Sequence, residues 1–339
     1  MFGAVGQKDV AVDLGTTNTL IYVDGQGIVL DEPSIVARDK ASKEPIAIGT
    51  EAKFMMGRTP ANIEVMRPLS DGVITDFEAC EQMLRYFIAK ALPGRRMGKP
   101  RMVICVPSGI SGVEHRSVRD AAEFAGARES VIVEEPVAAA IGAGLPIHHA
   151  AGNLVIDIGG GTTEVAVLSL GGVVASRSEK VGGLLMDKAI VDYARKEYNL
   201  ALGERTAEEI KIKLGSACPM PTEFEAEIRG RDLITGLPKT VVTTTSEIRE
   251  ALDEVVSGIV DALKVTLDST PPELAADCMD RGITLVGGGS LLAGMDRRLH
   301  IETGMPIRTV KNPLEVVVLG SAKFLASYDS LQALAAGKG

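Results

Sequence analysis

The chain has 339 residues, a length that corresponds to about two domains of ordinary size. Its 45 aspartates and glutamates outnumber its 36 lysines and arginines, and the net charge is -9. This sign disfavours nucleic acid as the main partner, because neutralising phosphates needs a basic surface. Every apolar run is interrupted by charge, glycine or proline well before bilayer length, so we expect no membrane span.

The four cysteines give no sign of a metal site or a disulfide framework. Cys80, Cys105, Cys218 and Cys278 lie far apart in the sequence and lack CxxC spacing. The first ten residues lack the charged and long apolar regions of a signal peptide. We therefore expect a protein of the reducing cytoplasm.

The first part of the chain predicts short strands joined by tight turns. Apolar runs at 9–14, 20–23 and 28–30 are separated by a Gly-Thr-Thr-Asn turn and an Asp-Gly turn, which is typical of hairpins. Residues 31–75 contain four prolines among short apolar pieces. Because proline is excluded from central strands, this segment predicts a small inserted subdomain.

Helices and strands then alternate. Apolar residues recur at helical spacing over 76–91, and 102–106 is a continuous apolar run of the kind found in buried strands. A strand is expected at 131–133, followed by a helix that opens at Pro136, where a missing N–H is tolerated.

The pattern restarts in the second half. Residues 154–176 repeat the order of 10–30: apolar strand, aspartate, glycine-rich turn, second strand, glycine turn and third strand. Such a duplicated unit indicates two related domains. An insertion is expected at about 185–245, followed by a helix over 246–267 with Ser246 as its N-cap. A last strand at 283–290 leads into a glycine turn, and a closing helix is expected at 314–325.

The duplicated turns have a common chemistry. Asp13 and Asp157 each stand at a strand end beside small residues, whose backbone N–H groups can approach an anion. The two acids would hold Mg²⁺ through water, since this ion keeps much of its hydration. One such turn alone is more often an ordinary hairpin, and only the duplication favours a polyphosphate site.

A third glycine turn follows the last predicted strand. Its flat backbone could lie against an adenine, although it could equally be a tight connection between a strand and a helix. It consists of Gly287, Gly288, Gly289 and Ser290. The P-loop pattern and the G-x-G-x-x-G pattern after the first strand are both absent from the sequence, which disfavours P-loop and Rossmann proteins.

Five sequence strings resemble, in order, the motifs of the actin, DnaK and sugar-kinase superfamily. They are DLGTTNT (13–19), IVEEPVAAAIGAG (132–144), IDIGGGTTEVAV (156–167), TLVGGGSLLAG (284–294) and NPLEVVVLGSAKFL (312–325). Within this superfamily the chain is most similar to the MreB bacterial actins, through stretches such as NTLIYVDGQGIVLDEPSIVA and RPLSDGVITDF. The resemblance covers the whole chain.

The resemblance implies an α/β, actin-like ATPase fold. Two RNase-H-like domains would each carry a smaller inserted subdomain, with ATP and Mg²⁺ in the interdomain cleft. The first domain would comprise 1–145 plus 312–339, with its insertion at about 31–75. The second would comprise 146–311, with its insertion at about 185–245.

Nucleotide contacts are expected in all three glycine turns, and the resemblance adds a predicted helix over 207–214. The implied contacts are Asp13, Gly15, Thr16, Thr17, Asn18, Gly159, Gly160, Gly161, Thr162, Glu208, Lys211, Gly287, Gly288, Gly289 and Ser290. Glu208 and Lys211 would contact the ribose or adenine side; the alternative is a plain surface ion pair.

For hydrolysis, the resemblance aligns Glu135 with the side chain that positions the attacking water. Thr162 could assist, and Asp157 would hold the metal. The neighbouring Glu134 would be structural, although the two roles could be reversed. One departure from the family pattern is Leu184, which follows the paired glycines where an acid is usual; Leu184 and Leu185 could be subdomain core or part of a subunit contact.

The implied function is that of an ATP-dependent filament protein at the inner face of the cell membrane, organising cell-wall elongation and rod shape. Its partners would be further copies of itself in paired protofilaments and the cell-wall elongation proteins. Membrane contacts are expected from Phe2, Leu92 and Met97, although the loop at 92–97 could instead be solvated. The alternative function is a sugar kinase of the same superfamily.

Overall fold

The structure, a computed structural model, describes residues 9–93 and 99–336. The chain divides into two compact units. Unit 1 comprises Met1–Asn153, Leu168–Val174 and Leu314–Gly339, and unit 2 comprises Leu154–Val167 and Ala175–Pro313. Within the described part of the chain, no helix is both long and apolar enough to cross a bilayer.

The main sheet of unit 1 has five strands in the order β10-β9-β1-β2-β3. β1 lies at its centre, parallel to β9 and antiparallel to β2. The strands are β1 (Val10–Leu14), β2 (Asn18–Val23), β3 (Gly27–Pro33), β9 (Arg101–Val106) and β10 (Glu129–Glu134). The strands expected at the start of the chain, at 102–106 and at 131–133 are therefore confirmed.

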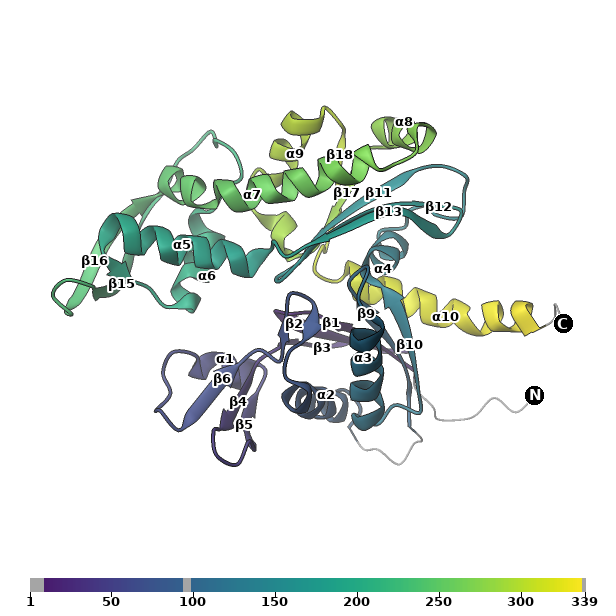
Figure 1. Cartoon of the computed structure of the whole chain (residues 1–339), viewed down its shortest axis with the longest axis horizontal. Coiled ribbons are helices and arrows are strands. Elements are labelled where there is room, and N and C mark those ends of the chain that lie inside the picture. The colour runs from purple at the N-terminus through teal and green to yellow at the C-terminus, as the bar shows by residue number, and fades with distance from the viewer. Residues whose placement is uncertain (1–8, 94–98, 337–339) are drawn as a thin grey trace. The chain divides into compact units, whose positions relative to one another are not determined.

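Helices cover both faces of this sheet (Figure 1). Val10, Val12 and Leu14 share one buried cluster with α2 (Phe77–Ala91) and α3 (Gly112–Phe124). Ala11 packs instead with Val318 of α10 (Val316–Ala336). This alternation is that of a strand buried on both sides, and it turns Asp13 away from the α2–α3 core.

On the second face, α10 packs closely on α4 (Glu135–Gly142). A Cβ added at Gly320 would collide with the carbonyl of Ala138, and one added at Gly142 would collide with the carbonyl of Val316. Glycine at both positions therefore lets the two helix backbones touch. α10 begins near the expected residue 314 but extends well beyond 325.

The insertion of unit 1 is a small sheet in the order β5-β4-β6 with one helix against it. Its elements are β4 (Val36–Asp39), β5 (Pro45–Ile48), α1 (Thr50–Met55) and β6 (Ile63–Met66). Buried Arg38 pairs with Glu64 at 3.0 Å and with Asp76 at 2.8 Å. A short hairpin, β7 (Leu69–Ser70) and β8 (Val73–Ile74), leads back toward α2.

The main sheet of unit 2 has the corresponding order β13-β12-β11-β17-β18. Its strands are β11 (Asn153–Ile158), β12 (Thr163–Ser169), β13 (Gly172–Glu179), β17 (Ile283–Val286) and β18 (Ile307–Thr309). β11 again lies at the centre, beside a parallel neighbour, β17. The duplication seen in the sequence is thus a duplication of sheet topology.

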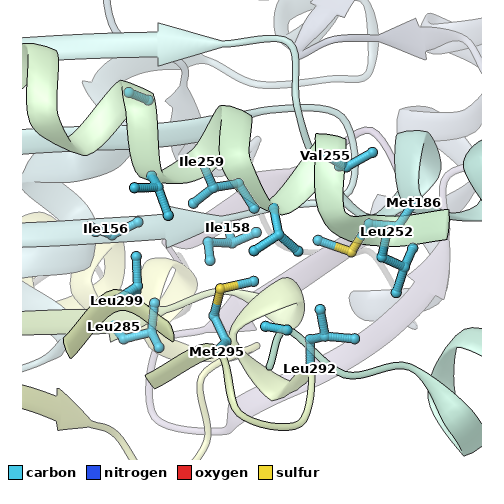
Figure 2. Packing of buried hydrophobic residues seen from close by; sticks show 14 of the residues in the cluster. Ile156, Ile158, Met186, Leu252, Val255, Ile259, Leu285, Leu292, Met295 and Leu299 are labelled. Atoms are coloured by element: carbon cyan, nitrogen blue, oxygen red, sulfur yellow. The ribbon is translucent and has the colours of Figure 1, made fainter. Parts of the chain in front are cut away.

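In the core of unit 2, buried apolar side chains of β11 pack with those of other strands and of several helices (Figure 2). Ile156 and Ile158 pack with Leu252 and Ile259 of α7 (Thr245–Asp268), and Asp157 lies between them in sequence. Because side chains alternate along a strand, Asp157 points away from this core.

The remaining elements of unit 2 include the insertion expected at about 185–245. They are α5 (Gly183–Tyr198), β14 (Leu200–Ala201), α6 (Glu204–Leu214), β15 (Glu225–Asp232), β16 (Pro238–Thr244), α8 (Pro272–Arg281), η1 (Gly288–Leu291) and α9 (Met295–Thr303). β14, β15 and β16 form a three-stranded sheet. The expected cap of α7 is wrong: Thr244, not Ser246, accepts from the backbone of Glu247 in a capping box.

The contact between α4 and α10 gives a stability prediction. Gly320→Ala should lower the free energy of unfolding by about 1–3 kcal/mol, because the added methyl meets backbone that cannot move aside. Urea unfolding followed by circular dichroism measures the change.

The matched control for this prediction is Gly112→Ala. A Cβ at Gly112 has nothing within 4 Å and its φ lies outside the left-handed region, so its unfolding midpoint should stay at the wild-type value or rise. An unchanged midpoint for Gly320→Ala would contradict the close helix packing.

Candidate nucleotide site

The first glycine turn follows β1 and is held from several sides. A Cβ at Gly15 would lie 2.7 Å from the carbonyl oxygen of Asn18, so the turn is too tight for a larger residue. The Ser34 hydroxyl donates to the Gly15 carbonyl at 2.6 Å. The backbone N–H of Gly72 donates to the Thr16 hydroxyl at 2.9 Å. Segments far along the chain therefore fix the shape of this turn.

The ionised form of the Asp13 carboxyl group is disfavoured in the folded chain. Burial raises the pKa of Asp13 to about 7, and the negative charge of Asp31 adds to the increase. Asp31 itself accepts a hydrogen bond of 2.8 Å from the side-chain amide of Asn18. A cation beside Asp13 would relieve this repulsion, so the residues present fit a bound magnesium ion.

Thr17 supplies a second polar group that suits a phosphate ligand. Its hydroxyl oxygen is buried and has no hydrogen-bond partner among the residues that the structure describes. Buried hydroxyls in folded proteins are normally paired with protein or water. The turn is thus suited to an added acceptor such as a phosphate oxygen.

The second glycine turn follows β11 and repeats this geometry in unit 2. Asp157 is buried at the end of the strand. The N–H of Gly159 donates to the carbonyl of Thr162 at 2.8 Å, and a Cβ at Gly159 would lie 3.1 Å from the same oxygen. Gly15 meets Asn18 at the same separation of three residues. The two repeats therefore form equivalent turns next to equivalent acids.

The third glycine turn lies directly against the second. Gly287 has a φ of 79°, and a Cβ there would collide with a carboxylate oxygen of Asp157. A Cβ at Gly289 would collide with the side chain of Ile158. The Ser290 hydroxyl donates to the carbonyl of Gly287 at 2.6 Å, which closes the turn. Unit 2 thus brings together residues that are far apart in the sequence.

The candidate catalytic acid lies on the same sheet edge as Asp13. β1, β9 and β10 are parallel, so their carboxyl ends meet at one edge of the sheet. Glu134 ends β10 and is exposed, whereas Glu135 is the first residue of α4 and is partly buried. Asp13 and Glu135 are therefore placed at a common edge of unit 1.

Glu208 and Lys211 lie on α6 as expected, but Lys211 bonds to α5. Its ammonium group donates to the carbonyl of Gly183 at 2.9 Å and pairs with Asp187 at 2.8 Å. The sequence pattern does not predict Asp187 as the partner of Lys211, because the two residues lie more than twenty positions apart.

Of the candidate membrane residues, only Leu92 is described. It is partly buried and packs against the core of unit 1. Phe2 and Met97 lie outside the described residues.

Comparison with known proteins decides the family. The model of the MreB/Mbl protein family matches residues 7–333. The chain belongs to the MreB/Mbl family. This confirms the resemblance seen in the five motifs, and the duplicated sheets are those of the actin-like fold.

Individual MreB/Mbl proteins match along nearly their whole length. The chain is 50% identical to the cell shape-determining protein MreB of Escherichia coli over 333 residues, which cover 97% of this chain and 96% of that protein. It is 48% identical to the cell shape-determining protein Mbl of Bacillus subtilis over 324 residues, covering 96% and 97%.

Solved structures of one further relative carry nucleotides. The ADP-bound crystal structure of MreB5 from Spiroplasma citri has a TM-score of 0.91 and 38% identity, covering 95% of this chain and 97% of that one. The same protein bound to AMPPNP also has a TM-score of 0.91, with 37% identity, and covers 97% and 99%.

The raised pKa of Asp13 predicts a pH-dependent stability. The pKa in the folded chain, about 7, exceeds the reference value of 3.8, so the folded chain holds this proton more tightly. The stabilisation that results is fully present below the unfolded pKa and is lost as the pH rises through about 7. Asp13→Asn should therefore stabilise the nucleotide-free chain at about pH 8 by roughly 1–3 kcal/mol, and by less at about pH 5.

Differential scanning calorimetry at these two pH values measures this difference. Asp24→Asn, a change at an exposed aspartate of the neighbouring hairpin, is the control and should keep the wild-type pH dependence. If Asp13→Asn and the wild type lost stability in parallel between the two pH values, the raised pKa of Asp13 would be disproved.

Proposed function

We propose that this MreB/Mbl protein is an actin-like ATPase that forms ATP-dependent filaments and organises cell-wall elongation and rod shape. The observation that carries the proposal is the match of nearly the whole chain to proteins named for determining cell shape. The matched acid–glycine turns of the two units support it, because a nucleotide-dependent filament needs a nucleotide site.

The nucleotide would be ATP or ADP with Mg²⁺. The ADP and AMPPNP bound to MreB5 support this assignment. Backbone N–H groups of Gly15, Thr16 and Gly160 would bind phosphate oxygens. Asp13 and Asp157 would hold the magnesium ion through water. When bound, this ion neutralises phosphate charge and polarises the bond to be broken.

In hydrolysis, Glu135 would hold a water molecule in line with the γ-phosphate, and Thr162 would donate a hydrogen bond to that water or to the phosphate. The position of Glu135 at the sheet edge that carries Asp13, together with its partial burial, supports this role. A carboxylate fixed at a helix start keeps the water oriented, which lowers the entropy lost in reaching the transition state.

ATP would also act as a conformational ligand. A bound γ-phosphate would favour the filament-forming state, and its loss would relax the subunit contacts. The filaments would lie at the inner face of the membrane, where many weak anchors act together. The sugar-kinase alternative receives no support from the relatives described above, which are named for cell shape.

A pelleting assay tests the proposal as a whole. Purified protein is centrifuged with Mg-ATP, with and without liposomes of anionic lipid, and the pellets are viewed by electron microscopy. Filaments that require Mg-ATP are expected, with more of them on the liposomes. Soluble monomers that phosphorylate a sugar would contradict the proposal and favour a kinase.

The role of Glu135 gives a separate prediction. Glu135→Gln should lower the rate of phosphate release by about 100-fold or more while filaments still form, because only the orientation of water is lost. Glu134→Gln, a change of the exposed neighbour, is the matched control and should keep the wild-type rate. The opposite result would assign the role to Glu134, and normal rates for both variants would exclude this strand end from catalysis.

The membrane contacts are tested with a paired change. Met97→Asp combined with removal of Phe2 should weaken co-sedimentation with anionic liposomes, because a buried apolar side chain contributes about 1.5 to 3 kcal/mol to lipid binding. ATP turnover of the same variant should persist. Unchanged lipid binding would show that these residues are not the anchors.

A further inference from the structure

An ion pair in unit 2 is buried next to the second glycine turn without belonging to it. The ammonium group of Lys211 on α6 lies 2.8 Å from a carboxylate oxygen of Asp187 on α5. The side chains are only 17% and 4% exposed. A buried ion pair of this kind adds little stability relative to apolar residues of similar size. Stability alone therefore does not explain why these two charges are buried beside the glycine turn.

The ammonium group of Lys211 links the pair to the backbone that supports the turn. It donates to the carbonyl of Gly183 at 2.9 Å. The N–H of Gly183 in turn donates to the carbonyl of Gly159 at 3.0 Å, and the N–H of Leu184 donates to the carbonyl of Gly160 at 2.8 Å. The ion pair and these hydrogen bonds therefore connect Asp187 to the glycine turn through Lys211 and Gly183.

The start of α5 fits tightly against this turn. A Cβ at Gly182 would lie 2.7 Å from the carbonyl oxygen of Gly159 and 2.8 Å from that of Gly160. Gly182 has an extended backbone with φ of -170°, which any residue can adopt, so space and not conformation requires glycine here. A Cβ at Gly183 would lie 3.4 Å from the ammonium nitrogen of Lys211.

The direction of these carbonyls fixes the direction of two amides. In a trans peptide the C=O and the following N–H point to opposite sides. Because the carbonyls of Gly159 and Gly160 point to α5, the N–H groups of Gly160 and Gly161 point away from it. These are the donors that would meet the phosphates of the nucleotide.

We propose that Asp187 and Lys211 are positioning residues of the phosphate site. Their ion pair holds Gly183 against the glycine turn, and so aims the amides of Gly160 and Gly161 at the nucleotide phosphates. The inference rests on the proposed nucleotide function. It gives Lys211 an indirect role, in contrast to the direct contact with ribose or adenine that the family resemblance implies.

The charges at the pair are consistent with this role. Burial raises the pKa of Asp187 to about 6, and the charge of Lys211 limits the increase, whereas Glu208 and Glu204 of α6 add to it. The carboxylate is therefore mostly ionised at neutral pH and can hold the ammonium group in place.

The test compares ATP with adenosine, which has the same base and sugar but no phosphate. Affinities of the full chain for both are measured by calorimetry or by competition against a fluorescent ATP analogue. Asp187→Asn and Lys211→Met should each weaken ATP binding by about tenfold or more, because the phosphates lose well-aimed donors. Adenosine binding should stay within about twofold of wild type.

Two exposed residues on the same helices provide matched controls. Asp192→Asn on α5 and Lys213→Met on α6 should bind both ligands as the wild type does. The double variant, Asp187→Asn with Lys211→Met, removes both charges, so it avoids the unpaired buried charge that could unfold a single variant. Its affinity for ATP should be lowered as in the single variants.

Each remaining result is decisive. Equal losses of ATP and adenosine affinity in Lys211→Met would overturn the inference in favour of direct contact. Wild-type ATP affinity in the folded double variant would show that the ion pair is only structural. If the wild-type chain bound neither ligand, the proposed nucleotide function itself would be wrong. The other results test only the role of the ion pair and leave the proposed function standing.

Discussion

The central strand of each main sheet carries an aspartate beside a tight glycine turn. Asp13 precedes the last residue of β1 and Asp157 precedes that of β11, and both point away from the principal cores of their units. At Asp13, burial and the nearby Asp31 raise the pKa to about 7. A cation beside the carboxylate removes this penalty, so the strand ends are suited to a metal-bound anion and the turns beside them to its phosphates.

Close approach of backbone to backbone is what makes these turns possible. Gly15 and Gly159 meet a carbonyl three residues later in each repeat, and Gly287 lies directly on Asp157. Distant segments then hold the turns rigid: Ser34 and Gly72 in unit 1, and the start of α5 in unit 2. Donors fixed in this way need no rearrangement when a charged ligand arrives, which increases their contribution to binding and catalysis.

Sequence patterns within short segments predict the strands, helices and turns that depend on neighbouring residues. The strand–acid–glycine repeats, the helix over 76–91 and the small insertions follow from periodicity, proline content and turn residues, and they are present in the structure. The supports of the site depend on contacts between distant positions, and no spacing rule connects Ser34 to Gly15 or Asp187 to Lys211. The expected cap of α7 is wrong because serine is by residue type the better cap, whereas the end of β16 at Thr244 selects the threonine.

The central claim is that the aspartates beside the glycine turns belong to a Mg-ATP site. The most direct test is a double-mutant cycle measured by calorimetry with Mg-ATP, using Asp13→Ala, Asp157→Ala and the combined variant. The account predicts that the wild-type chain binds Mg-ATP and that each single variant loses about tenfold or more in affinity. Wild-type affinity in either single variant would contradict it.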